Sequence, residues 1–400
     1  MWAALAGAVP VYWLYTLLLI DGGVSDEQLS VLLGIWSATA LVAEVPSGAL
    51  ADRWSRRHAV ALGGIAEASA FVVWAVVPTF SGFALGFALW GIGGSFASGA
   101  LEALLFDGLR AHGAGDRFPS ALGRVRAAEL WVQPPAAAAA TLLFTVGGHG
   151  LVLWVSVGWS LIGAVVATRL PDLRTGVAPI ETQLERVRAE PIRLETDDLS
   201  DPGFVHPGSE TIDGSGEPDL GYVATLRAGL REAATMPGLR MAVVMVALIG
   251  GFDAVDEYFP VMARGWGVST AATPIVLAVI SLAGAVAVAM AGRASFLGYR
   301  ALALLLAVSA ATLALSGAAG LPIGLTALAA GYGCYRLVAV IAEVRLQERI
   351  TGPARATVAS VAAFGIEISA LGLFAVWAIG GLAAVSVLLA VIAVAVWVCR

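Results

Sequence analysis

The sequence predicts an all-α integral membrane protein of about twelve transmembrane helices, arranged as two six-helix halves. Of the 400 residues, 59% are hydrophobic and only 13% are charged, which leaves too little charge to cover a water-soluble surface. Hydrophobic runs of about 18 residues or more recur along the chain, and about 20 helical residues cross the hydrocarbon core of a bilayer. The lipid bilayer is therefore the expected surroundings of most of the chain.

Twelve such runs precede and follow one long hydrophilic segment, six on each side. They are 3–20, 30–50, 60–78, 82–105, 127–146, 150–168, 240–262, 271–291, 300–317, 321–344, 356–378 and 380–398. Helices are favoured over a barrel because the runs lack a period of two and are rich in small residues that allow close helix packing, such as Gly82 and Gly86.

The hydrophilic segment divides the chain into a first bundle (1–168), a linker (169–239) and a second bundle (240–400), as in transporters built from repeats. From Glu195 to Asp219 the linker is acidic and rich in Pro, Gly and Ser, so we expect it to be largely disordered. Its later part, 222–234, places apolar residues on one helical face and arginines on another. This pattern predicts an amphipathic helix on the inner membrane surface.

The arginines alternate between successive loops. Nearly all of them lie in even-numbered loops, whereas the odd-numbered loops contain almost only Arg264. Because arginine accumulates in loops that stay in the cytoplasm, both termini and the linker are predicted to be cytoplasmic, in a cytoplasmic (inner) membrane. All 23 basic residues are arginine, which suggests a GC-rich, bacterial coding bias.

Several classes of chemistry have no basis in the sequence. The two cysteines, Cys334 and Cys399, lie in predicted spans, and the four histidines lie in loops without metal-ligand spacing, so we expect no disulfide, metal or other cofactor. A phosphate-binding loop needs a lysine, and the chain has none, which excludes ATP drive from this chain. We expect no enzyme activity, no nucleic-acid partner and a monomer.

The turn between the second and third spans reads Gly48-Ala49-Leu50-Ala51-Asp52-Arg53-Trp54-Ser55-Arg56-Arg57. It resembles the loop G-x-L-a-D-r-x-G-r-r of the major facilitator superfamily, with Ser55 in place of the second glycine. The resemblance implies a secondary transporter of two six-helix halves. The matching turn of the second half, Gly292 to Arg300, has no Asp, and the family's antiporter motif is absent from span five, which reads Gln133-Pro134-Pro135-Ala136.

In that family this turn typically makes a charge cluster that holds one conformation. The resemblance implies such a role here, with Gly48 allowing two helices to approach and Asp107, at the inner end of span four, pairing with one of the arginines. The predicted conformational latch is Gly48, Asp52, Arg53, Arg56, Arg57 and Asp107.

Charged residues inside spans are costly and usually face a partner or a water-filled cavity. Glu44 lies near the turn, beside Pro46, and is either a protonatable group of the inner vestibule or half of a salt bridge. Glu102 lies deeper, between small residues that would leave room for a substrate. Glu67 and Glu129 fit helix packing equally well.

Span seven contains the densest group of carboxylates: Asp253, Asp256 and Glu257. Spacings of three and four residues predict that all three share one helical face, where they would form a proton site or bind a basic substrate. The alternative is a solvated group at the outer end of the span, capped by Arg264.

Arg336 in span ten is the only basic residue deep inside a span. We expect it to form a salt bridge between the halves with Glu102, or to anchor an anionic substrate group, with Glu367 of span eleven as an alternative partner. Together these residues predict proton-coupled transport of a small molecule, with efflux of an amphipathic or cationic compound ahead of uptake of a metabolite by symport. A membrane sensor or an intramembrane enzyme is the alternative from another class.

Overall fold

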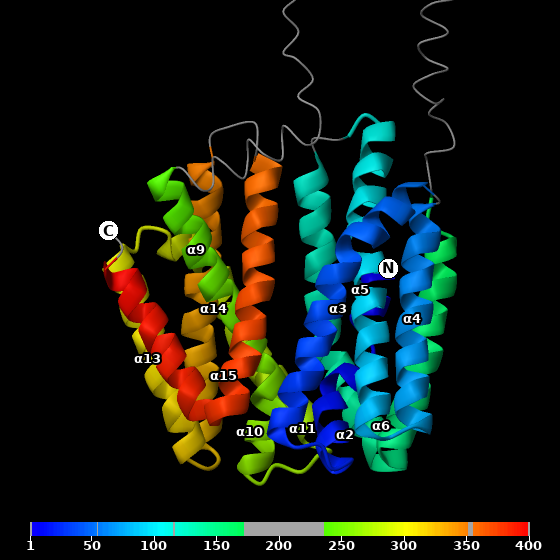
Figure 1. The fold of residues 1–400 in the computed structure, drawn as a ribbon, viewed down its shortest axis with the longest axis horizontal. Coiled ribbons are helices and arrows are strands. Elements are labelled where there is room, and N and C mark those ends of the chain that lie inside the picture. Colours follow the sequence, from blue (N-terminus) through cyan, green and yellow to red (C-terminus); the bar gives the residue numbers. More distant parts are fainter. Residues whose placement is uncertain (1, 54, 115–116, 172–235, 351–354, 399–400) are drawn as a thin grey trace, which may run out of the picture.

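The computed structural model describes residues 2–53, 55–114, 117–171, 236–350 and 355–398. The predicted amphipathic helix at 222–234 and the acidic part of the linker lie outside the described residues. We refer to residues 2–171 as the first half and to residues 236–398 as the second half. Each half is a bundle of roughly parallel helices, and the two bundles stand side by side (Figure 1).

The first half begins with three short helices: α1 (Trp2–Ala6), the 3₁₀ helix η1 (Pro10–Trp13) and α2 (Tyr15–Asp21). Four long helices follow: α3 (Asp26–Arg53), α4 (Arg56–Val76), α5 (Phe80–Ala111) and α6 (Phe118–Thr168).

The second half has the same beginning, with α9 (Pro237–Gly251), the 3₁₀ helix η4 (Phe252–Tyr258) and α10 (Phe259–Gly265). It continues with α11 (Thr273–Ala289), α12 (Ala291–Ala294), α13 (Tyr299–Ala318), α14 (Ile323–Arg349) and α15 (Arg355–Val398).

Two of the long helices each contain two predicted spans. Helix α6 is interrupted at Gly147 and Gly148, and α15 is interrupted at Gly381. Gly148 and Gly381 have φ angles of 60° and 56°, in the left-handed region that side chains with a Cβ rarely adopt. These glycines turn the chain at the positions where the sequence places the boundaries between spans five and six and between spans eleven and twelve.

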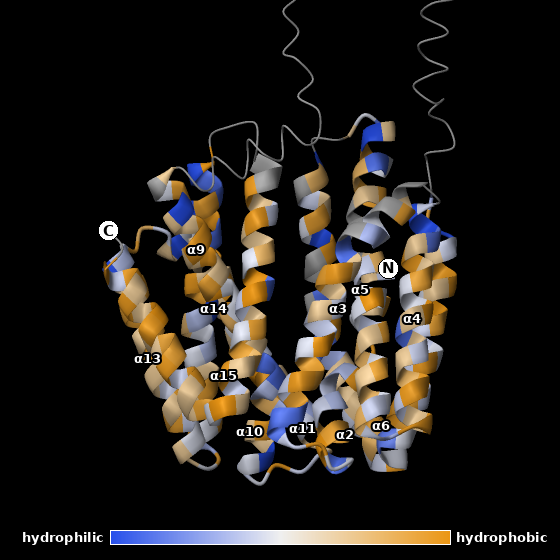
Figure 2. Ribbon diagram, in the orientation of Figure 1, coloured by the Kyte–Doolittle hydropathy of each residue, from blue (hydrophilic) through white to orange (hydrophobic). Residues whose placement is uncertain are grey.

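The length and hydrophobicity of the helices agree with the predicted fold class. Seven helical segments of the described chain are long and apolar enough to cross a membrane, and the shorter apolar helix Thr273–Ala289 comes close to that length. Figure 2 shows hydrophobic residues along the shafts of the helices and hydrophilic residues gathered mainly at their two ends. The prediction of an all-α integral membrane protein is confirmed.

The first span of each half is not the continuous helix that the hydrophobic runs predict. In the seventh span the α-helix ends at Gly251 and resumes at Phe259, with η4 between. Pro260 has no N–H to donate to the carbonyl of Asp256, and its ring clashes with that carbonyl in a regular α-helix. Pro10, at the start of η1, has the same deficiency in the first span.

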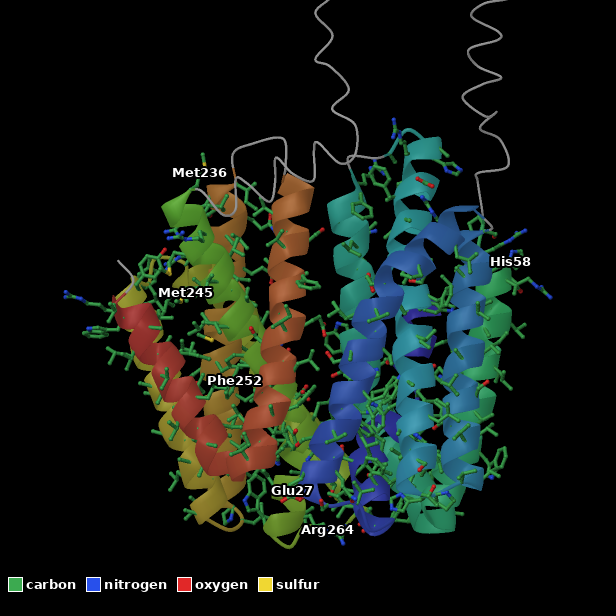
Figure 3. All side chains as sticks on the ribbon, in the orientation of Figure 1. Glu27, His58, Met236, Met245, Phe252 and Arg264 are labelled. Atoms are coloured by element: carbon green, nitrogen blue, oxygen red, sulfur yellow. The ribbon has the colours of Figure 1, made fainter. Side chains whose placement is uncertain are left out.

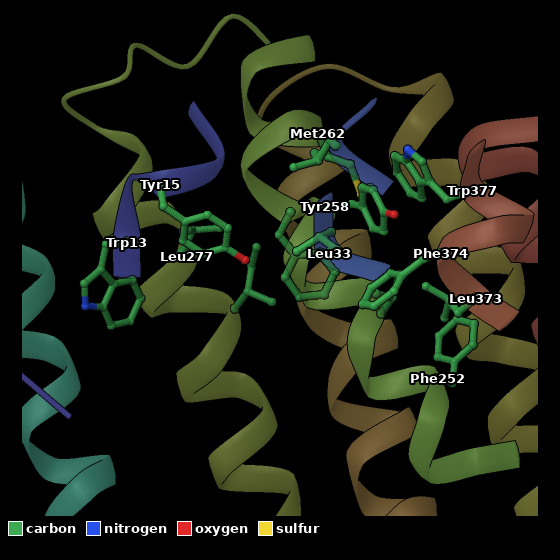
Figure 4. Packing of buried hydrophobic residues seen from close by; sticks show 14 of the residues in the cluster. Trp13, Tyr15, Leu33, Phe252, Tyr258, Met262, Leu277, Leu373, Phe374 and Trp377 are labelled. Atoms are coloured by element: carbon green, nitrogen blue, oxygen red, sulfur yellow. The ribbon is translucent and has the colours of Figure 1, made fainter. Parts of the chain in front are cut away.

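An aromatic core lies where the two halves meet. The ring of Tyr258 on η4 stacks on Trp377 of α15 at 3.8 Å between centroids, and both side chains are buried. Leu33 of α3 is fully buried and lies beside these rings (Figure 4). The packing therefore fixes η4, with its carboxylates, at the boundary between the halves.

Candidate transport site

Helix η4 presents its three carboxylates in two directions, Asp253 and Asp256 in one and Glu257 in another. A 3₁₀ helix has 3.0 residues per turn, so residues three apart are aligned, whereas Glu257 is turned about 120° away from the other two. The prediction that all three carboxylates share one helical face is therefore wrong for Glu257. The reason is the change of helix type that accompanies Pro260.

Asp253 faces α14 of its own half. Its carboxylate forms an ion pair with Arg336, and the hydroxyl of Tyr332 donates a second hydrogen bond to it at 3.1 Å. The guanidinium of Arg336 also lies 6.0 Å from the centre of the Tyr332 ring. Asp253 is thus held by a cation and a hydroxyl on successive turns of α14.

The expected partner of Arg336 is therefore corrected. The prediction names Glu102 or Glu367, but Arg336 pairs with Asp253 inside the second half. Glu367 instead accepts a hydrogen bond of 2.9 Å from Ser37 of α3 in the first half. The side chain of Glu102 lies outside the described residues.

Glu257 faces the first half. Its carboxylate accepts a hydrogen bond from the hydroxyl of Tyr15 on α2, and its backbone carbonyl accepts one of 3.3 Å from Thr16. Next to it, the hydroxyls of Tyr258 and Ser30 are 2.8 Å apart across the same boundary. Asp256 is exposed. Helix η4 therefore connects a charged pair in one half to polar contacts with the other.

Arg264 does not cap these carboxylates. It forms an ion pair with Asp21 at the end of α2, and Asp21 also lies 2.8 Å from Nε2 of His149 at the start of the second part of α6. Burial alone would raise the pKa of Asp21, but the hydrogen bonds from His149 and Arg264 outweigh it and hold this pKa below its usual range. We call this group the Asp21 cluster and its end of the molecule the Asp21 end.

At the opposite end, Arg56 at the start of α4 forms an ion pair with Asp107 of α5 and donates a hydrogen bond of 3.1 Å to the carbonyl of Ala103. Of the arginines in the predicted latch, Arg56 is therefore the partner of Asp107 that the described residues define. The side chains of Asp52 and Arg53 lie outside them, and Arg57 is half-buried. Because Arg110 and Arg345 also lie here, we call this the arginine-rich end; Figure 3 shows His58 at this end and Arg264 at the other.

The packing role expected of Gly48 stays a prediction. A Cβ added at Gly48 would meet no described atom within 4 Å. Close approaches occur elsewhere. A Cβ at Gly251 would come within 2.3 Å of Ser369 on α15, and one at Gly86 within 2.0 Å of the Trp74 ring.

Glu67 makes a contact with the first span that the sequence did not predict. Its carboxylate accepts a hydrogen bond from Tyr12 on η1, whose ring stacks on Trp90 at 5.2 Å between centroids, and Trp36 lies 5.5 Å from Trp90. The tyrosines of the first span thus reach one carboxylate in each half, Tyr12 reaching Glu67 and Tyr15 reaching Glu257. Interruption of the first span is the structural cause, and Pro10 was its sequence signal.

The two halves are closed together at the Asp21 end and diverge towards the arginine-rich end. The contact between Ser37 and Glu367 joins α3 and α15, but Glu44 and Ser360, each seven residues further along the same helical faces, are exposed. Figure 1 shows the same divergence of α3 and α15. Glu44 therefore lies on the open side of this contact.

Within the described residues, no group of three or more His, Cys, Asp or Glu side chains is arranged to hold a metal ion. What the arrangement offers is a set of carboxylates and aromatic rings at the junction of two helical bundles, with discontinuous first spans in both. That is the architecture of a secondary transporter, in which substrate and coupling ion bind between two repeats.

Comparison with known proteins agrees with this class. The family model of the Major Facilitator Superfamily matches residues 1–371, and the chain belongs to that family, whose members are transporters of small molecules and not enzymes. The recognition made from the turn at Gly48 to Arg57 is confirmed. No curated protein sequence matches the chain.

Solved structures share the fold at low identity. A mutant of the nucleoside transporter NupG matches with a TM-score of 0.67 and 14% identity over 99% of this chain and 96% of that one. A D-xylose-proton symporter matches with 0.66 and 13% over 99% and 96%. A bacterial homolog of the human lysosomal transporter Spinster, inward-facing and unoccupied, matches with 0.65 and 15% over 96% and 78%.

Proposed function

We propose that the protein exports a small amphipathic cation across the cytoplasmic membrane in exchange for protons, with its arginine-rich end in the cytoplasm. The observation that carries the proposal is the surplus of carboxylates over basic groups where the halves meet. Asp256, Glu257 and Glu367 form no ion pair within the described residues, and Arg336 is already paired with Asp253. A cation would complement this charge.

Aromatic side chains support the same substrate class. Trp36, Trp90 and Tyr12 form a continuous group on α3, α5 and η1, and Tyr332 lies beside Asp253 in the second half. Aromatic faces attract cations and bury apolar groups, so such a wall suits a cation with an apolar body. The arginine distribution supports the orientation, because arginine-rich loops stay in the cytoplasm. In this orientation the divergence of α3 and α15 corresponds to an inward-open state.

Glu257 is the proposed coupling residue. As a carboxylate it accepts a strong hydrogen bond from Tyr15 and so helps hold the halves together at the Asp21 end. Protonation would weaken that hydrogen bond, because a neutral carboxyl is a poorer acceptor, and would favour separation of the halves there. Proton binding and opening at the Asp21 end would then be linked.

The test is transport by purified protein in proteoliposomes with an imposed pH gradient, using ethidium as the cationic probe and a sugar and a nucleoside as neutral comparisons. We expect ethidium to move against the proton flow. Glu257→Gln should abolish accumulation driven by the gradient but retain exchange of labelled for unlabelled ethidium, and Glu348→Gln, an exposed carboxylate near the end of α14, should behave as the unmodified protein.

Three results would contradict the proposal. The first is transport of a neutral compound but not of ethidium, which rejects the substrate class. The second is movement of the substrate in the direction of proton flow, which indicates symport. The third is gradient-driven accumulation that survives in Glu257→Gln, which rejects the coupling residue.

A further inference from the structure

A cavity lies inside the second half, apart from the junction of the halves. It has a volume of about 290 Å³ and lies among α9, α13, α14 and the last turns of α15, at the arginine-rich end. This volume is near the lower limit of small-molecule sites, which is about 300 Å³. Its walls are apolar and include Met241, Met245, Val246, Ile249 and Val338. Figure 3 shows Met236 and Met245 along α9 on this side of the molecule.

The mouth of the cavity is cationic. Arg345 and Arg349 of α14 line it together with Tyr299, and the two guanidinium groups lie 5.1 Å and 5.8 Å from the centre of the Tyr299 ring. Neither arginine forms an ion pair with a described acidic residue. No described acidic residue therefore balances these two positive charges, which lie one turn apart at the entrance to an apolar space.

Arg345 has a donor that points to a missing partner. Its Nη2 donates to the backbone carbonyls of Leu297 and Ser295, the latter at 3.2 Å, which fixes the side chain in place. Its Nη1 is buried and has no hydrogen-bond partner within the described residues. A buried donor on a charged group is costly to leave unpaired, so a fixed guanidinium with a spare N–H suits an external acceptor.

From these observations we infer that the cavity binds one anionic phospholipid, with its phosphate on Arg345 and Arg349 and part of an acyl chain among the methionine and aliphatic side chains of α9. Guanidinium groups pair well with phosphate oxygens, and the adaptable methionine side chains suit a flexible chain. Met241, on the wall, is 41% exposed, so the cavity is open to the molecule's surroundings. The inference does not depend on the proposed substrate or on proton coupling.

Native mass spectrometry of the full chain, released from nanodiscs of mixed phosphatidylglycerol and phosphatidylcholine, tests this inference. We expect one phosphatidylglycerol to be retained selectively. Arg349→Gln should reduce the retained fraction at least fivefold. Met245→Trp, which fills the cavity and keeps both arginines, should do the same. Arg293→Gln removes an exposed charge from the same half at the same end without touching the cavity, and it should retain the lipid as the unmodified protein does.

Thermal melting provides a second readout if a variant proves less stable. Phosphatidylglycerol should raise the melting temperature of the unmodified protein and of Arg293→Gln, but not that of Met245→Trp. Equal retention of phosphatidylcholine, an equal stabilisation by inorganic phosphate, or an equal loss in Arg293→Gln would overturn the inference. Unchanged retention in both Arg349→Gln and Met245→Trp would overturn it too, and would leave the acidic linker of this chain as the alternative anion.

Discussion

Arg336 on α14 and Asp253 on η4 form an ion pair within the second half, and Tyr332 donates a further hydrogen bond to the same carboxylate. The pair neutralises the one arginine deep inside a predicted span and, at the same time, anchors the 3₁₀ segment that carries Asp256 and Glu257. An anchor for η4 at one end and the contact of Glu257 with Tyr15 at the other make this short segment one of the connections between the halves.

The pair should show strong non-additivity. Asp253→Asn and Arg336→Gln should each lower the melting temperature, because each leaves a partly buried partner unpaired. The double variant should lose less than the sum of the two single losses. We expect an interaction energy between about 0.5 and 3 kcal/mol from the double-mutant cycle. Additive losses would show that the two side chains do not stabilise one another.

The Asp21 cluster should hold the Asp21 end closed, and this closure should depend on pH. Because pairing lowers the pKa of Asp21, the closed state binds fewer protons than a state in which the pair is broken. Closure is therefore fully favoured above the ordinary aspartate pKa of about 3.9, and it is lost as the pH falls through the lowered value.

Electron paramagnetic resonance would follow this opening through the distance between spin labels at Val146 and Gly320, in a variant without the two native cysteines. We expect a short distance from pH 7 down to about 4 and a longer one below, near the carboxyl range. Asp21→Asn should shift the distribution to longer distances at neutral pH and reduce the acid-dependent change. A distribution that is the same for Asp21→Asn and the unmodified protein would reject this role.

The ion pair at the arginine-rich end offers a test of the predicted latch. Arg56→Gln and Asp107→Asn should each slow turnover by up to about fivefold, since a partly exposed pair contributes up to about 1 kcal/mol, and should leave substrate affinity nearly unchanged. The charge-exchanged variant Arg56→Asp with Asp107→Arg should recover part of the rate. Asp52→Asn should behave like the single variants. A loss of affinity with unchanged turnover would place these residues in substrate binding instead.

Glycine at position 251 should be required by packing. Gly251→Ala places a methyl group against Ser369 and the backbone of Ile366 and Ala370, so it should destabilise the fold by about 1–3 kcal/mol and disturb the start of η4. Gly372→Ala on α15 is the matched control, since its Cβ would meet no described atom within 4 Å. Thermal melting compares them. Equal melting temperatures for the two variants would show that the contact relaxes without penalty.

Particular residues show how far sequence patterns reach. Hydrophobic runs predicted the turns at Gly147–Gly148 and near Gly381, and the motif at Gly48 to Arg57 identified the family, because both signals are local. The partners of Arg336, Asp21 and Glu257 could not be predicted, since each depends on the direction in which a side chain leaves its helix. The change of helix type in η4 turns Glu257 away from Asp253, and the hydrophobicity of the segment does not indicate this change.

The sequence by itself determined the membrane class, the approximate ends of the spans, the grouping of the hydrophobic runs on either side of one hydrophilic segment, and the family. These properties follow from composition and from short motifs, because the lipid surroundings and backbone hydrogen bonding act on each segment separately. Only the tertiary structure decided which carboxylate meets which partner, at which end the halves close, and that Arg345 and Arg349 stand over an apolar cavity. Pairing between distant segments is set by the packing of whole helices, and a rotation of about 100° per residue decides which side chain faces the partner.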